Sequence, residues 1–234
     1  MHRESHREQR IIEGLRTVRA RIDTAARSFD RDPAGIRLLA VSKLVSASDI
    51  RIAHAAGQDC FGESYLNEAL PKLAALQDPA PEWHFIGPVQ SNKTRGIAEQ
   101  FDWVHSVDRL KIAQRLSEQR PRARAPLNIC LQVNISDETT KSGLSLDALY
   151  RLAPEIAALP NLRLRGLMAI PAPSADRDVQ RAAFRGLRAA QDRLNAQGLA
   201  LDTLSMGMSD DLEAAIAEGA TIVRVGSAIF GARK

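Results

Sequence analysis

A lysine stands directly after an apolar run near the start of the chain. Residues 38–43 read LLAVSK, so Lys43 follows four apolar residues and a serine. Apolar surroundings lower the pKa of a lysine amine, because they disfavour the charged ammonium. The neutral amine is a nucleophile that forms Schiff bases with carbonyl compounds. The position is equally compatible with a lysine that reaches solvent from a strand end, or that binds a phosphate as a point charge.

Two stretches near the C-terminus, SMGMSDD and VRVGSAIFG, contain the small residues that anion sites use. Gly226 and Ser227 follow an apolar run, so their backbone amides can approach an anion closely. Each stretch alone is compatible with a plain turn. Together, after the last two strands of a barrel, they favour a phosphate site.

The first of these stretches also predicts a helix start. We expect Asp210 to cap the next helix, with Glu213 at its third position, which leaves Ser209 beside the positive helix end. Asp210 and Asp211 could instead bind a metal, but no histidine or third carboxylate lies in this loop. Capping therefore explains both aspartates.

Arg224 and His84 are polar residues inside apolar strand patterns. Arg224 lies two residues before Gly226, so both point to the same side of an extended strand. A ring nitrogen of a ligand is one candidate partner for Arg224, and a protein carboxylate such as Glu63 is the other. A histidine such as His84 in an apolar strand is more often a hydrogen-bonded core residue than a catalyst.

The elements that must position these residues alternate between short apolar runs and amphipathic helical segments. The eight expected strands are 37–43, 58–63, 83–87, 103–107, 128–134, 163–170, 203–207 and 222–226. Apolar residues at helical spacing over 3–28 (Ile11, Ile12, Leu15, Val18 and Ile22) predict a helix before the first strand.

Eight such repeats with nearly continuous apolar strands predict an α/β fold, a single (β/α)8 TIM barrel. A doubly wound sheet is the alternative, but no GxGxxG or GxxxxGK[ST] motif follows any strand. We expect one domain over residues 1–234, with residues 1–30 forming a helix that packs on the barrel.

Composition limits the classes of function. The chain has 234 residues, of which 44% are hydrophobic and 26% charged, and 4% are aromatic. Its net charge of +4 comes from arginines mixed with acidic residues, and few aromatics are present to stack on bases, so no nucleic-acid partner is expected. The charged start MHRESHREQR is unlike a secretory signal, and no run is apolar enough for a membrane span. Cys60 and Cys130 are expected to be buried free thiols in a cytoplasmic protein.

The motifs LLAVSK, FGESY, EWHFIGPVQSNK, VHSVDR, VNISDETTKSG, LRGLMAIPAP and SMGMSDDLEAAIAEGATIVRVGSAIFG occur in this order. Together they resemble the pyridoxal phosphate homeostasis proteins, also called proline synthetase co-transcribed homologues, over nearly the whole chain from Arg37 to Arg233. The resemblance implies an alanine racemase-like barrel (fold type III of the pyridoxal phosphate proteins) without a second β domain. It also implies pyridoxal 5'-phosphate (PLP) held as a Schiff base on Lys43.

By the same resemblance, further residues are expected to contact the cofactor. The residues that it places there are Lys43, Ser64, His84, Met168, Ser209, Arg224, Gly226 and Ser227. Those matching Ser209, Gly226 and Ser227 hold the phosphate in that family, and the one matching Arg224 lies near the pyridine nitrogen. The family usually reads FGENY where this chain has FGESY, and Ser64 has a shorter reach than the asparagine that it replaces. Lys141 matches a second family lysine that is suggested to act in cofactor transfer; the alternative is an ordinary loop lysine.

The resemblance implies a carrier that keeps free PLP low and passes it to PLP-dependent apoenzymes. A lone barrel with charged helices is compatible with a monomer. A PLP-dependent racemase is the alternative, and it needs an acid and a base on opposite faces of the substrate carbon. Related racemases take a tyrosine from a second domain, which we do not expect after the eighth strand. An arginine at the pyridine nitrogen also weakens the ring as an electron acceptor. A barrel aldolase that uses Lys43 without a cofactor is the third reading.

Overall fold

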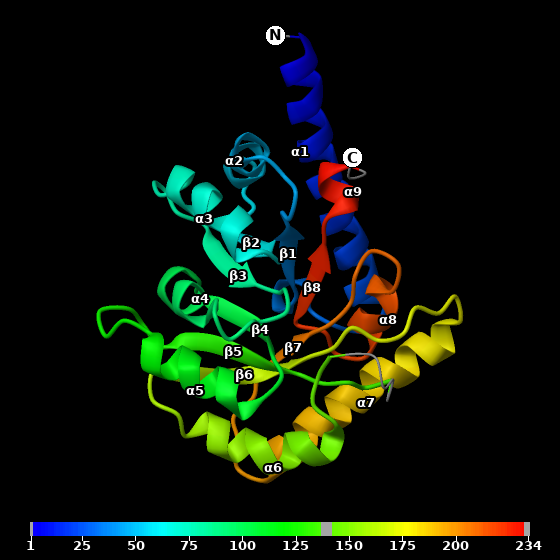
Figure 1. Cartoon of the computed structure of the whole chain (residues 1–234). Helices are drawn as coiled ribbons and strands as arrows, with labels where there is room; N and C mark the ends of the chain where they lie inside the picture. The colour runs from blue at the N-terminus through cyan, green and yellow to red at the C-terminus, as the bar shows by residue number, and fades with distance from the viewer. Residues whose placement is uncertain (1, 137–141, 232–234) are drawn as a thin grey trace.

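The computed structural model describes residues 2–136 and 142–231, which form a closed barrel of parallel strands surrounded by helices (Figure 1). The strands pair in chain order, and β8 closes the barrel by pairing with β1. The strands are β1 (Arg37–Val41), β2 (Cys60–Glu63), β3 (Glu82–Phe85), β4 (Trp103–Val107), β5 (Leu127–Gln132), β6 (Leu162–Met168), β7 (Thr203–Ser205) and β8 (Ile222–Val225). The predicted (β/α)8 barrel is confirmed, and each of the eight expected strands is present.

Helices follow the strands and cover the outside of the barrel. They are α2 (Ala47–Ala55), α3 (Leu66–Ala75), α4 (Thr94–Gln100), α5 (Leu110–Gln119), α6 (Leu146–Ala157), α7 (Arg177–Ala196), α8 (Leu212–Ala217) and α9 (Ser227–Phe230). Most strand residues are buried, because one side faces these helices and the other faces the barrel interior. This two-sided burial is the reason that the strand sequences read as nearly continuous apolar runs.

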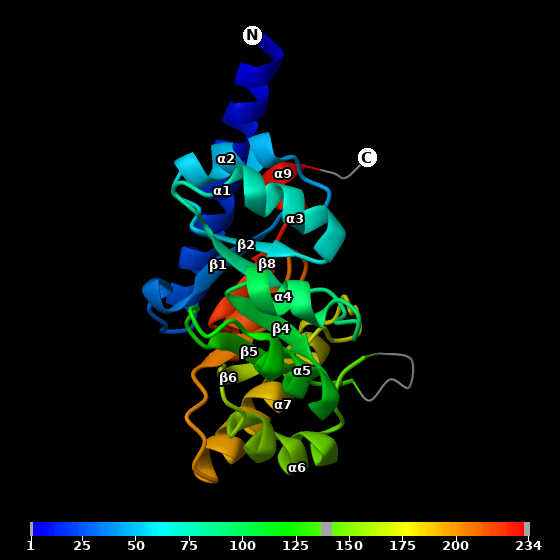
Figure 2. The ribbon, with the colours of Figure 1, turned by 60° about the vertical axis from the view of Figure 1, so that its left-hand side comes forward.

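Helix α1 (His2–Ser28) completes the ring of helices. It packs against α8, α2 and α9, and so lies between elements from opposite ends of the chain (Figures 1 and 2). Its buried face contains Ile11, Leu15, Val18 and Ile22, as the helical spacing predicts. Ile12 was wrongly included in that face: its side chain is 43% exposed, because it lies one position around the helix from Ile11.

The two cysteines are free and buried, as predicted. Burial raises the pKa of each thiol to about 12, so both are poor nucleophiles at neutral pH. Over residues 2–136 and 142–231, no group of three or more His, Cys, Asp or Glu side chains is arranged to hold a metal ion. In the same ranges, no helix has both the length and the apolar character needed to cross a membrane.

Gly14 permits the close packing of α1 on α9. A Cβ atom at this position would lie 2.8 Å from the carbonyl oxygens of both Ala228 and Ile229. These are backbone atoms of the short helix that follows β8, so they cannot rotate away as a flexible side chain would. The absence of a side chain at Gly14 therefore fixes how closely α1 approaches the end of β8.

We predict that Gly14→Ala lowers the free energy of unfolding by about 1–3 kcal/mol, because the added methyl group overpacks the α1–α9 contact. The matched control is Gly186→Ala in α7, where the nearest atom to the added Cβ is the end of the Ile135 side chain at 3.2 Å. Both substitutions gain helix propensity, so the control should be neutral or stabilising. Urea denaturation of the two variants measures the difference, and equal stabilities would contradict this account.

Candidate functional site

The carboxyl ends of the parallel strands bring the predicted site residues to one end of the barrel. Lys43 lies two residues after β1, and Ser64 directly follows β2. Ser209 lies in the loop after β7, and Gly226 directly follows β8. Strands far apart in the sequence therefore deliver an amine, hydroxyls and a glycine to the same face, as the barrel prediction requires.

The backbone on both sides of Lys43 is fixed by hydrogen bonds. The amide of Ser42 donates to the carbonyl oxygen of Gly62 at 2.9 Å, and its hydroxyl donates to Oε1 of Glu63 at 2.5 Å. On the other side, the amide of Leu44 donates to Oε1 of Glu68 at 2.5 Å. Leu44 has φ of 62°, a left-handed conformation that a residue with a Cβ adopts at a cost. The neighbouring elements therefore hold the turn that carries Lys43.

A second lysine, Lys72 of α3, lies buried beneath this turn and links its supports. Its Nζ donates to both carboxylate oxygens of Glu63, at 3.0 and 3.1 Å, and to Oε1 of Glu68 at 2.5 Å. It also donates to the carbonyl oxygen of Ser42 at 2.8 Å. Burial raises the pKa of Glu63, while the hydrogen bond from Ser42 and the charge of Lys72 oppose that rise. Lys72 thus neutralises a buried carboxylate and fixes the residue before Lys43.

Arg224 points into the barrel, as its position in β8 predicts, but its partners are not carboxylates. Its Nη1 donates to the carbonyl oxygen of Ser205 at 2.6 Å and to Oγ of Ser205 at 2.7 Å, and its Nη2 donates to the carbonyl oxygen of Ala169 at 2.9 Å. Burial lowers the pKa of Arg224 to about 10, so the guanidinium remains charged at neutral pH. The suggested pairing with Glu63 is wrong, because Glu63 bonds to Ser42 and Lys72.

His84 lies within β3, and Met168 is the last residue of β6. Met168 ends β6 and packs against Trp103 and Cys130, directly before Ala169, whose carbonyl binds Arg224. His84 is fully buried within β3, and both ring nitrogens already have partners. These hydrogen bonds are those expected of a core histidine, and a contact between His84 and the cofactor stays a prediction.

The loop after β7 differs from the predicted helix cap. Helix α8 begins after Asp211, not Asp210, and Asp211 caps no helix amide with its side chain. Instead, Oδ1 of Asp211 accepts from the amide of Met208 at 2.6 Å, which closes the loop that carries Ser209. Glu213 bonds to Arg21 of α1 through Nε, at 2.5 Å, and Nη2, at 2.8 Å. Asp211 therefore sets the shape of the loop that carries Ser209, and Arg21 of α1 holds α8 through Glu213.

Several side chains around these predicted residues were not found from the sequence. Lys72, His105 and Ser205 are polar residues inside apolar patterns, which is a signal of buried hydrogen bonding, but it does not identify partners. Lys141 lies outside the described residues, so its suggested role stays a prediction.

Comparison with known proteins identifies the class first. Residues 15–234 match the alanine racemase N-terminal domain family, and the closed parallel barrel agrees with that match. The described chain is thus a barrel of the alanine racemase N-terminal kind.

Curated relatives then identify the family. The Pyridoxal phosphate homeostasis protein of Pseudomonas aeruginosa is 63% identical over 223 residues, which are 95% of this chain and 96% of that protein. The Escherichia coli protein of the same name is 52% identical over 226 residues, 95% of this chain and 97% of that protein. The chain belongs to the pyridoxal phosphate homeostasis protein family.

Solved structures agree with this assignment. PipY of Synechococcus elongatus, solved without PLP, has a TM-score of 0.85 and 39% identity, and covers 94% of this chain and 100% of its own. The structure of PipY with PLP bound has a TM-score of 0.84 and 38% identity, with the same coverage. The predicted family resemblance is therefore confirmed.

We predict that Lys72→Met lowers the free energy of unfolding by about 3–5 kcal/mol at neutral pH, because it leaves the buried Glu63 carboxylate without its cation. Removal of Lys72 raises the folded-state pKa of Glu63 further above its unfolded value of about 4.3. The variant should keep most of its stability below that value and lose it as the pH rises towards neutral.

The control for this prediction is the double variant Lys72→Met with Glu63→Gln, which removes the buried charge. Its stability should vary less with pH than that of Lys72→Met. Chemical denaturation at a series of pH values measures both, and identical pH profiles would show that Glu63 is not the group involved.

Proposed function

We propose that this protein binds PLP as a Schiff base on Lys43, and that it buffers the cofactor and delivers it inside the cell. One observation carries the proposal: Lys43 and the loops after β7 and β8 lie at the same end of the barrel. The interior of this barrel contains the buried guanidinium of Arg224. Relatives that match this chain over nearly their full length are named for PLP homeostasis, and the similar PipY has been solved with PLP bound.

The residues present fit the chemical groups of PLP. A Schiff base requires an amine held in place, and the turn of Lys43 is fixed on both sides by Ser42 and Leu44. The phosphate would be bound by Ser209, Gly226 and Ser227. Gly226 is buried and Ser227 exposed, which presents the start of α9 to the mouth of the barrel. An aldehyde and a phosphate on one small molecule thus find complementary groups on neighbouring strands.

Arg224 supports a carrier in preference to a PLP enzyme. When bound, PLP supplies an electron-accepting ring, whose strength depends on a proton at the pyridine nitrogen. In our proposal Arg224 faces this nitrogen, and a guanidinium that donates a hydrogen bond there disfavours its protonation. The hydrogen bonds from Nη1 and Nη2 to Ser205 and Ala169 hold the guanidinium in the barrel interior.

Further parts of the proposal follow from this role. PLP-dependent apoenzymes would receive the cofactor, the working form would be a monomer, and the site of action would be the cytoplasm.

Met168 and Ser64 would lie against the cofactor. Ser64 follows β2 and is half-buried, next to the turn that carries Lys43, and its hydroxyl can donate and accept a hydrogen bond.

We predict that added PLP gives a Schiff-base absorption band that borohydride reduction fixes on Lys43. Lys43→Ala should lose both the band and the label. The matched control is Lys93→Ala, since Lys93 is a half-exposed lysine on the same side of the barrel that bonds to Asn67. The control should keep the band, and peptide mass spectrometry locates the label. A label on Lys93, or no band with the wild type, would contradict the proposed function. Racemisation of amino acids at a substantial rate would contradict the carrier role.

A further inference from the structure

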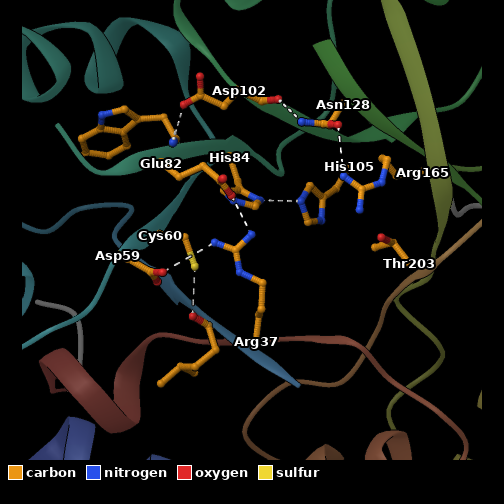
Figure 3. Close-up of polar contacts among 12 residues, drawn as sticks. Arg37, Asp59, Cys60, Glu82, His84, Asp102, His105, Asn128, Arg165 and Thr203 are labelled. Carbon is orange, nitrogen blue, oxygen red and sulfur yellow. Dashed lines mark hydrogen bonds and ion pairs between the residues drawn. The ribbon is translucent and has the colours of Figure 1, made fainter. Parts of the chain in front are cut away.

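A continuous series of hydrogen-bonded side chains runs through the barrel interior away from Arg224. Oγ of Ser205 accepts from Arg224 and lies 2.7 Å from Nδ1 of His105. Nε2 of His105 lies 2.8 Å from Nδ1 of His84, and Nε2 of His84 lies 2.6 Å from Oε1 of Glu82 (Figure 3). These five residues come from β8, β7, β4 and β3. We call them the interior chain.

The Arg224 end fixes the direction of the hydrogen bonds. A guanidinium has only donors, so Oγ of Ser205 must accept from Arg224. Ser205 is fully buried, and no other acceptor among the described residues takes its hydroxyl hydrogen. A buried hydroxyl keeps a hydrogen bond where one is within reach, so Ser205 donates to Nδ1 of His105. That nitrogen is then unprotonated, and His105 carries its proton on Nε2.

The Glu82 end gives the same direction independently. Arg37 donates to Oε1 of Glu82 at 2.8 Å. Burial opposes ionisation of Glu82, but the hydrogen bonds from His84 and Arg37 and the charge of Arg37 lower its pKa to about 2. The ionised carboxylate can only accept, so Nε2 of His84 donates to it. Nδ1 of a neutral His84 is then an acceptor, and it must receive the proton on Nε2 of His105.

Both histidines are neutral in this arrangement, and their surroundings agree. Burial is the main cause that lowers the pKa of His84, and burial lowers the pKa of His105 further, aided by the charges of Arg224 and Arg37. His84 also stacks on Trp103, with ring centroids 5.4 Å apart and an angle of 4°. Two neutral imidazole rings, each protonated on Nε2, therefore lie between the cation of Arg224 and the anion of Glu82.

We propose that His105 is a positioning residue for Arg224, which it orients through the hydroxyl of Ser205. Because Ser205 donates its hydrogen to His105, its oxygen presents its lone pairs to Arg224. Hydrogen bonds in such a series strengthen one another, and each bond towards Glu82 makes Ser205 a better acceptor. The interior chain thus holds the guanidinium towards the pyridine nitrogen. This last step rests on the proposed function, whereas the direction of the chain does not.

The first test needs no ligand. Long-range ¹H–¹⁵N NMR of the ligand-free wild type distinguishes a histidine protonated on Nε2 from one protonated on Nδ1. At neutral pH we expect both His84 and His105 to be neutral and protonated on Nε2. A proton on Nδ1 of His105, or an imidazolium at either residue, would overturn the proposal.

The second test measures the effect on ligand binding. The probes are PLP and its 1-deaza analogue, in which a C–H group replaces the ring nitrogen. His105→Phe should weaken PLP binding by about tenfold, the size of one weakened hydrogen bond to a charged group, and the analogue by about twofold or less. Ser205→Ala is a smaller change that removes only the hydroxyl, and it should give the same pattern.

The matched control is His54→Phe, because His54 lies on α2 and its Nδ1 bonds to the backbone oxygen of Gln58 at 2.8 Å, outside the interior chain. It should bind both probes as the wild type does. An equal loss for both probes in the His105 and Ser205 variants would mean a general structural role and would overturn the proposal. Failure of the wild type to bind PLP would instead reject the proposed function, and with it the role of Arg224 at the pyridine nitrogen. The histidine tautomers would still establish the direction of the hydrogen bonds in the interior chain.

Discussion

The buried guanidinium of Arg224 is the constraint on which the barrel interior depends. A charge inside a closed barrel is costly unless oxygens surround it, and here a hydroxyl and two carbonyl oxygens from Ser205 and Ala169 do so. The hydroxyl then needs an acceptor of its own, which is the reason that histidines lie on β3 and β4 where apolar side chains would otherwise fill the barrel. At the far end, the carboxylate of Glu82 completes the series beside Arg37. One buried cation thus explains a polar core in strands that are otherwise apolar.

The two lysines of the site region have different physical tasks. Lys72 is a buried ammonium with four oxygen contacts, and its charge is used to stabilise Glu63 and the backbone of Ser42. Lys43 lies on the turn that these contacts hold, at the mouth of the barrel. A fixed turn limits the directions in which the amine can point, which favours a bond at one defined place. The arrangement separates the residue that reacts in our proposal from the residue that positions it.

The fold was predictable because its signals are local and repeated. Eight apolar runs alternate with helical patterns, and each expected strand is present in the barrel.

Arg224 was correctly placed on the inner side of β8 by the twofold period of a strand. Its partners were not, because Ser205 and Ala169 come close only through the pairing of β6, β7 and β8. The predicted start of α8 was wrong by one residue, and the expected side-chain cap is not made: the Asp211 carboxylate accepts from the loop amide of Met208 and not from a helix amide. The role of Lys72 was not predicted, because nothing in the sequence shows that its side chain faces Glu63.

A crystal structure of the wild-type protein with PLP tests the central claim most directly. The account predicts electron density continuous with the Nζ atom of Lys43, with the phosphate at the loops after β7 and β8 and the pyridine nitrogen facing Arg224. A second candidate position exists, a pocket of about 270 Å³ lined by residues including Tyr65, Asn67 and Lys93. PLP bound only there, or with its ring nitrogen turned away from Arg224, would contradict the account.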